Sequence, residues 1–378
     1  MNAYVRTAVT IIVLAAIGGA IFFLEGKMGK GMASTLRGDS NIAINMTDAR
    51  IAAKAKLYPV AKDISTPDGF INADPFTIQS LIGKKVILVD FWTYSCINCE
   101  RTLPYLNSWY QKYKDDGLVI VGVHTPEFEF EQQLANVQMA VKKFGVQYPV
   151  VLDNDYSTWT AYGNQYWPRE YLIDIDGFIV HDHIGEGSYD ETEAAIVKAL
   201  NERKQVLGET GAVTVKTGQP TAADSAFNPA DVQSPETYLG AARIQYLNNM
   251  PSHSCLSGSC SYTFSGSKNF QGYELMGAWK IGDEYAELSS AGALRINFSA
   301  NKVNLVAGTT GKPVRAKILI DGVAVTASNQ GADVKDGIVT FSTHDLYNLV
   351  DLHSAAGSHL LEIQFIDPGV DAFAFTFG

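Results

Sequence analysis

The segment from Val86 to Cys99 constrains the fold more than any other stretch of this chain. It begins with a continuous apolar run that is interrupted only by Asp90, which is typical of a strand buried on both faces of a sheet. Two cysteines in a Cys-x-x-Cys spacing, Cys96 and Cys99, follow directly. The segment therefore predicts a central strand that ends in a cysteine-bearing turn.

A helix is expected after this turn, from Glu100 to about Asp115, because apolar residues recur there at helical spacing: Leu103, Leu106 and Trp109. A cysteine at a helix N-terminus faces unpaired backbone N–H groups and the positive end of the helix dipole, and both favour the thiolate. Cys96 is thus predicted to be the exposed, attacking sulfur. Cys99, one turn further along, would resolve the resulting mixed disulfide.

Two other uses of these cysteines fit the sequence less well. A tetrahedral zinc site needs four ligands, and no second Cys-x-x-Cys or histidine pair with ligand spacing follows, so no metal site is predicted. The spacing Thr93-x-x-Cys96 matches the end of the peroxiredoxin pattern, but Val89 stands where that pattern requires proline. The second cysteine, Cys99, is also unlike that family.

Three stretches resemble known redox proteins. Asp90-Phe-Trp before the turn and Pro104 after it are similar to the thioredoxin active-site segment. Together with Arg101–Tyr105 and Gly122–Phe128, they resemble the soluble part of the membrane-tethered TlpA- and DipZ-type thioredoxin-like proteins. The resemblance implies a TlpA-type α/β thioredoxin-like fold, a redox-active Cys96–Cys99 disulfide, protein disulfides or thiols as substrates, and no cofactor beyond the cysteine pair.

The resemblance also suggests roles for residues around the turn. Burial would raise the pKa of Asp90 and make it a candidate to take the Cys99 proton, unless it only caps the strand end or faces solvent. Trp167-Pro168 would be a cis bond that docks the substrate chain, the alternative being an ordinary trans turn proline. Trp92 and Tyr94 are assigned to packing and to the rim of the substrate site.

The redox domain is predicted to span residues 60–207 with the element order βαβαβαββα. Ser188 and Glu191 have the spacing of a capping box that would start the last helix, which runs to about Arg203. The expected strands are 86–92, 118–123, 148–152, 170–174 and 178–183, and the expected intervening helices are about 100–115, 129–144 and 157–163.

The N-terminus predicts a membrane anchor. Ala8–Leu24 is uncharged and apolar, and as a helix it would reach roughly 25 Å, at the short end of a bilayer span. The bulky Phe22 and Phe23 stand where a signal-peptide cleavage site needs small residues. We therefore expect residues 1–25 to be an uncleaved anchor and not a cleaved signal peptide. Residues 26–59 are predicted to be a tether with one short helix near 48–56. Flanking positive charges are nearly balanced, so cysteine usage and the resemblance decide the orientation, with the soluble domains outside a single-pass cytoplasmic membrane.

Composition narrows the classes of partner. The chain has 40 acidic and 29 basic residues, a formal net charge of −11, and no basic cluster, so nucleic acid is not an expected partner. Its four cysteines fall in two close pairs, which suits an oxidising compartment such as the periplasm or the cell exterior.

The remainder of the chain predicts a second domain. Residues 208–234 are rich in Thr, Gly, Ala and Pro and are expected to be a linker. Residues 235–378 show short strands separated by turn residues, a pattern that favours an all-β sandwich or jelly roll. Both ends of this part, Pro235–Gly240 and Asp367–Gly378, resemble the C-terminal β domain of DipZ proteins. The expected strands are 273–280, 284–288, 293–298, 303–307, 314–320, 337–342, 359–365 and 372–377.

Two features of this β domain leave alternatives open. Cys255 and Cys260 could form a structural disulfide, serve as an auxiliary redox pair, or hold a soft metal together with Met250 and His253. A group of aromatic residues could form a carbohydrate-binding face or pack in the core: Tyr238, Tyr262, Tyr273, Trp279 and Tyr285.

The resemblance thus implies a membrane-anchored, extracytoplasmic thiol–disulfide oxidoreductase. It favours reduction of protein disulfides, with cytochrome c maturation as one setting. DipZ proteins carry a multi-span electron-transfer domain, whereas this chain shows a single span, so a separate membrane donor such as a CcdA-like protein is expected. The alternative is an envelope glycan- or protein-binding protein on a thioredoxin-like scaffold.

Overall fold

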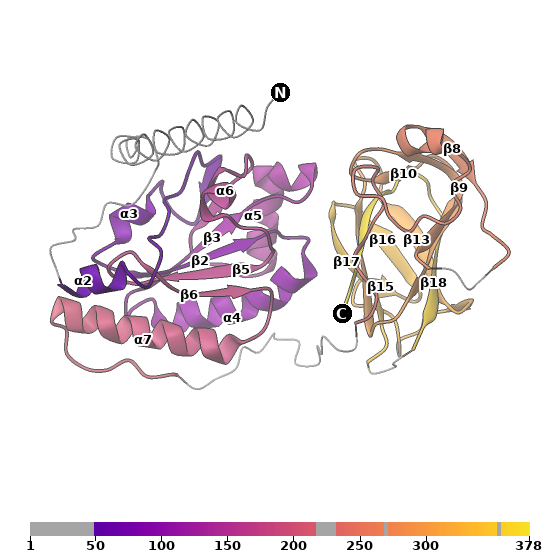
Figure 1. Cartoon of the computed structure of the whole chain (residues 1–378). Coiled ribbons are helices and arrows are strands. Elements are labelled where there is room, and N and C mark those ends of the chain that lie inside the picture. Colours follow the sequence, from indigo (N-terminus) through magenta and orange to yellow (C-terminus); the bar gives the residue numbers. More distant parts are fainter. Residues whose placement is uncertain (1–48, 217–231, 268–270, 354–356) are drawn as a thin grey trace, which may run out of the picture. The chain divides into compact units, whose positions relative to one another are not determined.

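The computed structural model describes residues 49–216, 232–267, 271–353 and 357–378 (Figure 1). The predicted anchor and most of the predicted tether and linker lie outside these residues. Within the described ranges, no helix has both the length and the apolar character needed to cross a bilayer.

Residues 49–216 form an α/β domain around a six-stranded sheet with the order β1-β4-β3-β2-β5-β6 (Figure 1). The central strand β2 runs parallel to β3 and antiparallel to β5, and all seven of its residues are buried. The strands are β1 (Gly69–Ile71), β2 (Val86–Trp92), β3 (Leu118–His124), β4 (Val150–Leu152), β5 (Arg169–Ile173) and β6 (Ile179–Ile184).

Helices cover both faces of this sheet. One core joins Leu88 and Leu172 of the sheet to apolar residues of α4, α5 and α7, while Phe91 on the opposite face packs edge-on against Trp159 and Tyr162 of α6. The helical elements are α3 (Ile78–Leu81), α4 (Ile97–Tyr113), the 3-10 turn η1 (Glu129–Gln132), α5 (Leu134–Lys143), α6 (Ser157–Tyr162) and α7 (Tyr189–Leu207).

The predicted element order from residue 86 onward is confirmed, and β1 and α3 precede it. The predicted capping box of the last helix is wrong. Ser188 has φ 47° and ψ 30°, and its side chain makes no capping hydrogen bond. A side-chain N-cap normally requires extended backbone, so the left-handed conformation of Ser188 removes the geometry that the box needs.

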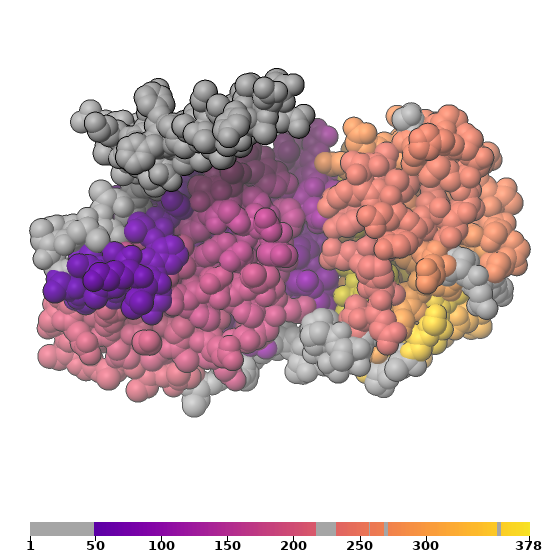
Figure 2. All heavy atoms as spheres, viewed as in Figure 1, coloured from indigo at the N-terminus to yellow at the C-terminus, as the bar shows by residue number. Residues whose placement is uncertain are grey.

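A short helix at the start of the described chain, α2 (Ala49–Lys54), lies against the domain, as the indigo atoms show in Figure 2. The Lys54 ammonium contacts carboxylates of Asp174 (2.5 Å), Asp176 (2.8 Å) and Glu202 (2.5 Å). Arg50 adds a pair of hydrogen bonds to Asp176. Residues from α2 onward are therefore packed on the redox domain, about ten positions before its predicted start at residue 60.

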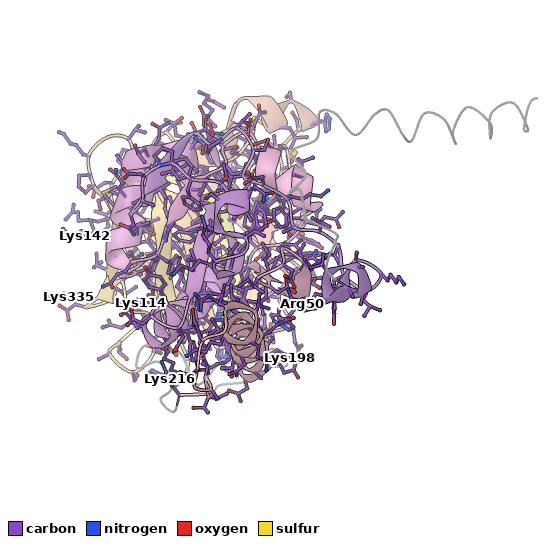
Figure 3. The ribbon with its side chains drawn as sticks, turned by 90° about the vertical axis from the view of Figure 1, so that its left-hand side faces the viewer. Arg50, Lys114, Lys142, Lys198, Lys216 and Lys335 are labelled. Carbon is purple, nitrogen blue, oxygen red and sulfur yellow. A yellow bond between two sulfur atoms is a disulfide. The ribbon has the colours of Figure 1, made fainter. Side chains whose placement is uncertain are left out.

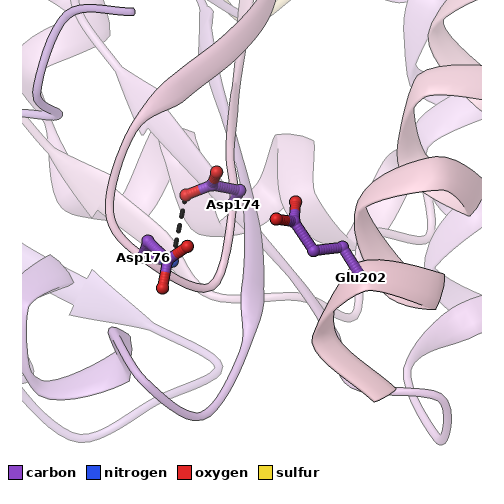
Figure 4. Close-up of side chains that lie close together, drawn as sticks. All are labelled: Asp174, Asp176 and Glu202. Carbon is purple, nitrogen blue, oxygen red and sulfur yellow. Dashed lines mark hydrogen bonds between the residues drawn. The ribbon is translucent and has the colours of Figure 1, made fainter. Parts of the chain in front are cut away.

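The three acidic partners of Lys54 form the one His/Cys/Asp/Glu group within the described ranges whose ligand atoms are close enough to hold a metal ion (Figure 4). Asp176 donates its backbone N–H to Asp174 at 3.0 Å, which fixes the turn. Burial alone would lower the pKa of Lys54, but its hydrogen bonds to the carboxylates raise it above the usual value. The Lys54 ammonium therefore already pairs with all three carboxylates of this cluster.

Residues 234–378 form an all-β domain with a 13-stranded, nearly closed sheet. Strand β9 pairs with β11 through its first half and with β10 through its second. Between them Gly277 has φ 98°, and a Cβ there would lie 2.5 Å from the Ala291 carbonyl oxygen, so the bend requires glycine. The strands are β7 (Thr237–Tyr238), β8 (Ser259–Tyr262), β9 (Tyr273–Ile281), β10 (Ala286–Leu288), β11 (Gly292–Phe298), β12 (Lys302–Gly308), β13 (Val314–Ile320), β14 (Val323–Ala324), β15 (Val334–Lys335), β16 (Ile338–Phe341), β17 (Asp345–Asp351), β18 (His359–Phe365) and β19 (Asp371–Phe377).

The structure bears on the alternatives left open for this domain. Cys255 and Cys260 are joined in a disulfide, so neither sulfur is a thiolate that could bind a soft metal. Of the five aromatic residues, Tyr262, Tyr273 and Trp279 are buried in the core, as the packing alternative requires, and Tyr238 and Tyr285 are half-buried. Exposed lysines come from separate elements, such as Lys142 on α5, Lys198 on α7 and Lys335 on β15 (Figure 3).

Candidate redox site

The two cysteines of the turn have different environments. Cys96 is the N-cap of α4, with extended backbone (φ −87°, ψ 115°), and its Sγ accepts the backbone N–H of Cys99 at 3.3 Å. It is half-buried, whereas Cys99 is 1% exposed. An N–H donor and the N-terminal end of a helix therefore both lie at Cys96 Sγ.

The environment of Cys99 favours the protonated thiol. Burial raises the pKa of Cys99 well above its usual value, and its hydrogen bond to Cys96 and the charges of Cys96 and Asp90 raise it further. The backbone at Thr93 opposes this shift. Cys99 therefore needs a base before it can attack, and Asp90 is near enough to act on it electrostatically.

Asp90 lies in the middle of β2 on the sheet face that carries Leu88 and packs against α4. It is 1% exposed, and burial raises its pKa to about 8. Its Oδ1 has no hydrogen-bond partner in the described part of the chain. A carboxyl that titrates near neutral pH beside Cys99 can accept and return a proton.

Trp167 and Pro168 lie opposite the cysteine turn. Their peptide bond is cis, and the Trp167 carbonyl oxygen is 3.9 Å from Cys96 Sγ. The indole is held by a hydrogen bond from Nε1 to the Thr125 carbonyl at 3.0 Å and by contact with Trp159 at a centroid distance of 4.3 Å. The loop before β5 thus presents its backbone to the attacking sulfur.

The assignment of Trp92 and Tyr94 to a substrate rim is wrong. Trp92 is 0% exposed and Tyr94 is 3% exposed. Trp92 meets the ring of His124 edge-on at 5.2 Å, and Tyr94 stacks on the same ring at 5.7 Å and donates its hydroxyl to the His344 carbonyl at 3.3 Å. Both therefore pack beneath the turn. His124 is also fully buried, and burial lowers its pKa to about 3, so it is neutral and no proton acceptor near pH 7.

Sequence reasoning missed two buried carboxyls of this region. Glu131 accepts hydrogen bonds from the Ser95 hydroxyl (2.7 Å) and from the backbone N–H groups of Glu127 (2.6 Å) and Phe128 (3.0 Å), which ties the residue before Cys96 to η1. Burial raises its pKa to about 7. It lies in an acidic stretch that resembles an exposed helix face, so no local signal marked it. Glu170 did carry a signal, since it is an acidic residue inside the apolar strand after Pro168.

Relatives of known name support this reading of the geometry. Residues 60–200 match the family described as Redoxin, and residues 234–378 match the family described as Thioredoxin like C-terminal domain. The chain is 34% identical over 334 residues to protein DipZ of Mycobacterium tuberculosis, an alignment that covers 86% of this chain and 44% of DipZ. It thus spans less than half the length of that relative.

A shorter relative is covered more fully. The chain is 32% identical over 136 residues to the thiol-disulfide oxidoreductase ResA of Bacillus anthracis. This alignment covers 34% of this chain and 76% of ResA. A solved structure of a thioredoxin family thiol:disulfide interchange protein from Chlorobium tepidum is 24% identical, covering 38% of this chain and 97% of that one with a TM-score of 0.33. With the half-exposed Cys96, the buried Cys99 and the match to ResA, the chain belongs to the thioredoxin-like thiol-disulfide oxidoreductases.

Proposed function

We propose that the protein exchanges disulfides with protein substrates through Cys96 and Cys99, and that it works as a reductase. The observation that carries this proposal is the asymmetry of the two sulfurs. Cys96 is half-exposed and accepts an N–H, whereas Cys99 is buried beside a carboxyl that titrates near neutral pH.

The reaction then follows from these positions. The Cys96 thiolate attacks one sulfur of a substrate disulfide, and the other substrate sulfur leaves as a thiolate. Asp90 takes the proton of Cys99, whose thiolate attacks Cys96 Sγ and breaks the mixed disulfide. The products are a reduced substrate with two thiols, after its thiolates gain protons, and an oxidised Cys96–Cys99 pair. The cysteine pair supplies both electrons.

The setting of this reaction belongs to the same proposal. The apolar stretch 8–24 would anchor the chain in the cytoplasmic membrane, with the domains outside, where a disulfide such as Cys255–Cys260 persists. A CcdA-like membrane protein would then return electrons to the oxidised pair. Cytochrome c maturation is one such process, in which the reductase would reduce the disulfides of apocytochromes.

Trapping tests the division of labour between the cysteines. A Cys99→Ser variant of the full chain should accumulate a mixed disulfide with a peptide disulfide substrate, because no second thiol can resolve it. The matched Cys96→Ser variant should trap none. Equal trapping by both variants, or disulfide reduction by the double variant, would refute the assignment.

The reduction potential of the wild-type pair tests the direction. Equilibration of the full chain in detergent with glutathione buffers, followed by thiol trapping, should give a potential near about −270 mV or below, as for thioredoxin. A value near about −120 mV would instead identify a protein that makes disulfides.

A further inference from the structure

A row of titratable residues crosses three neighbouring strands at the level of Asp90. Asp90 on β2 is paired with Glu170 on β5, and Glu170 is paired with His183 on β6. Residues directly opposite on antiparallel strands project from the same face, with Cβ atoms about 4.5–5.5 Å apart. The row therefore lies on the face of the sheet that α4 and α7 cover.

The row is buried at one end and reaches the surface at the other. Asp90 and Glu170 are each 1% exposed, whereas His183 is half-buried. Asp90 Oδ1, Glu170 Oε2 and His183 Nε2 are all buried atoms with no hydrogen-bond partner in the described ranges. An unpaired buried polar atom costs about 1–3 kcal/mol, so three of them along one row suggest a use other than stability.

The two carboxyls titrate near neutral pH, so each can take up or release a proton there. Burial raises the pKa of Glu170 to about 8, and the charge of Asp90 adds to the shift, while the Thr192 hydroxyl on α7 opposes it. Two carboxyls that face each other lose their protons one after the other, and the two apparent pKa values describe the pair and not either residue alone. The Tyr148 phenol, whose pKa is raised by burial and by the charges of Asp90, Glu170 and Cys99, stays protonated beside them.

The outer end of the row contains a second histidine. His181 Nε2 is 3.2 Å from the Thr192 hydroxyl, which also acts on Glu170. Burial lowers the pKa of His181, the charge of His183 lowers it further, and Asp182 and Glu191 oppose the shift. His181 and His183 are both half-buried, so each can exchange a proton with solvent.

We propose that Glu170 acts through Asp90: it receives the proton that Asp90 takes from Cys99, and the histidine pair His181 and His183 releases a proton to solvent. This inference rests on the proposed function. One proton leaves Cys99 Sγ for the Asp90 carboxylate, and Asp90 passes one to Glu170. Glu170 passes one to the histidine pair, so Asp90 is ready for the next turnover. No electron moves along the row.

The test measures the step in which Cys99 has to lose its proton. Reduced full-length protein is mixed with a peptide disulfide, and closure of the Cys96–Cys99 pair is followed by stopped-flow fluorescence between about pH 5 and 9. Glu170→Gln should close about tenfold more slowly at pH 7, with a changed pH profile, and an added imidazole buffer should not restore the rate, because Glu170 and Asp90 are buried. In a Cys99→Ser background, Glu170→Gln should leave the rate of Cys96 alkylation unchanged.

Two further variants complete the design. The His181→Gln/His183→Gln variant alters half-buried positions and should show the same slowing, but here an added imidazole buffer should restore the rate, because it replaces the group at the solvent end of the row. Glu193→Gln serves as the matched control, because Glu193 is a buried carboxyl of the same domain that bonds Tyr113 instead of facing the row. A wild-type rate and pH profile in both Glu170→Gln and the histidine variant would overturn the relay. A wild-type protein that fails to exchange disulfides would instead overturn the proposed function.

Discussion

Replacing Asp90 with asparagine should stabilise the redox domain at neutral pH. Burial raises the pKa of Asp90 from 3.8 to about 8, so the folded protein keeps a proton at pH 7 that the unfolded chain releases. Because the folded pKa is the higher one, this linkage penalty is absent below about pH 4, grows as the pH rises, and is complete above about pH 8. A pH of 7 is about three units above the pKa of the unfolded carboxyl. A difference of this size corresponds to a penalty of about 4 kcal/mol.

Asparagine does not ionise, so Asp90→Asn should raise the free energy of unfolding at pH 7 by up to about 4 kcal/mol and change it little at pH 4. Urea titration of the reduced protein followed by tryptophan fluorescence measures this. Four of the five tryptophans lie in the redox domain: Trp92, Trp109, Trp159 and Trp167. A gain that is equal at both pH values, or no gain at pH 7, would refute the reasoning.

A matched control has the opposite sign. Asp153 is also buried, but its carboxylate accepts the backbone N–H groups of Thr158 and Trp159 and the Thr125 hydroxyl. Asp153→Asn loses at least one of these acceptor contacts and should destabilise the same domain by about 1–3 kcal/mol at pH 7. Burial of a carboxyl by itself therefore does not predict the effect, since what its oxygens accept decides the sign.

Two other contacts give predictions of stability. Glu131→Gln removes an acceptor oxygen from the N–H groups and the Ser95 hydroxyl around the turn, so the midpoint of thermal unfolding should fall, with a loss of about 1–3 kcal/mol; an unchanged midpoint would show that Glu131 does not hold the turn. Lys54→Met leaves three carboxylates without their shared cation and should cost about 3 kcal/mol or more in urea titration. Lys56→Met, at an exposed position two residues further on, is the control for a general loss of positive charge.

Local signals predicted the centre of this fold well. The apolar run of β2, the cysteine turn and the helix after it are encoded within one short segment, so they follow from strand burial and helical periodicity without tertiary information. The same holds for the eight predicted strands of the β domain. Strand β17 was not predicted, since Asp345, Asn348 and Asp351 give it a polar composition that is unfavourable in strands.

Predictions that depended on tertiary contacts were less successful. Tyr94 looks like a rim residue in the sequence because it adjoins the cysteine turn, but the ring of His124 and the carbonyl of His344 bury it. The hydrogen bond between the Ser95 hydroxyl and Glu131 joins two segments that are far apart in the chain. Ser188 has the right neighbours for a capping box, but its left-handed backbone conformation removes the geometry that the box needs.

The surroundings of Asp90 explain why the proposed relay runs in only one direction across the sheet. On β3 the residue paired with Asp90 is Gly122, and a Cβ there would lie 2.9 Å from Trp92 Nε1 and 3.3 Å from the Tyr148 ring. The two aromatic side chains therefore occupy that side and leave no carboxyl or histidine in the row. On β5 the paired residue is Glu170, which can hold a proton. A proton that reaches Asp90 from Cys99 thus has a carboxyl to accept it toward β6, whereas toward β3 it meets the Tyr148 phenol, which stays protonated.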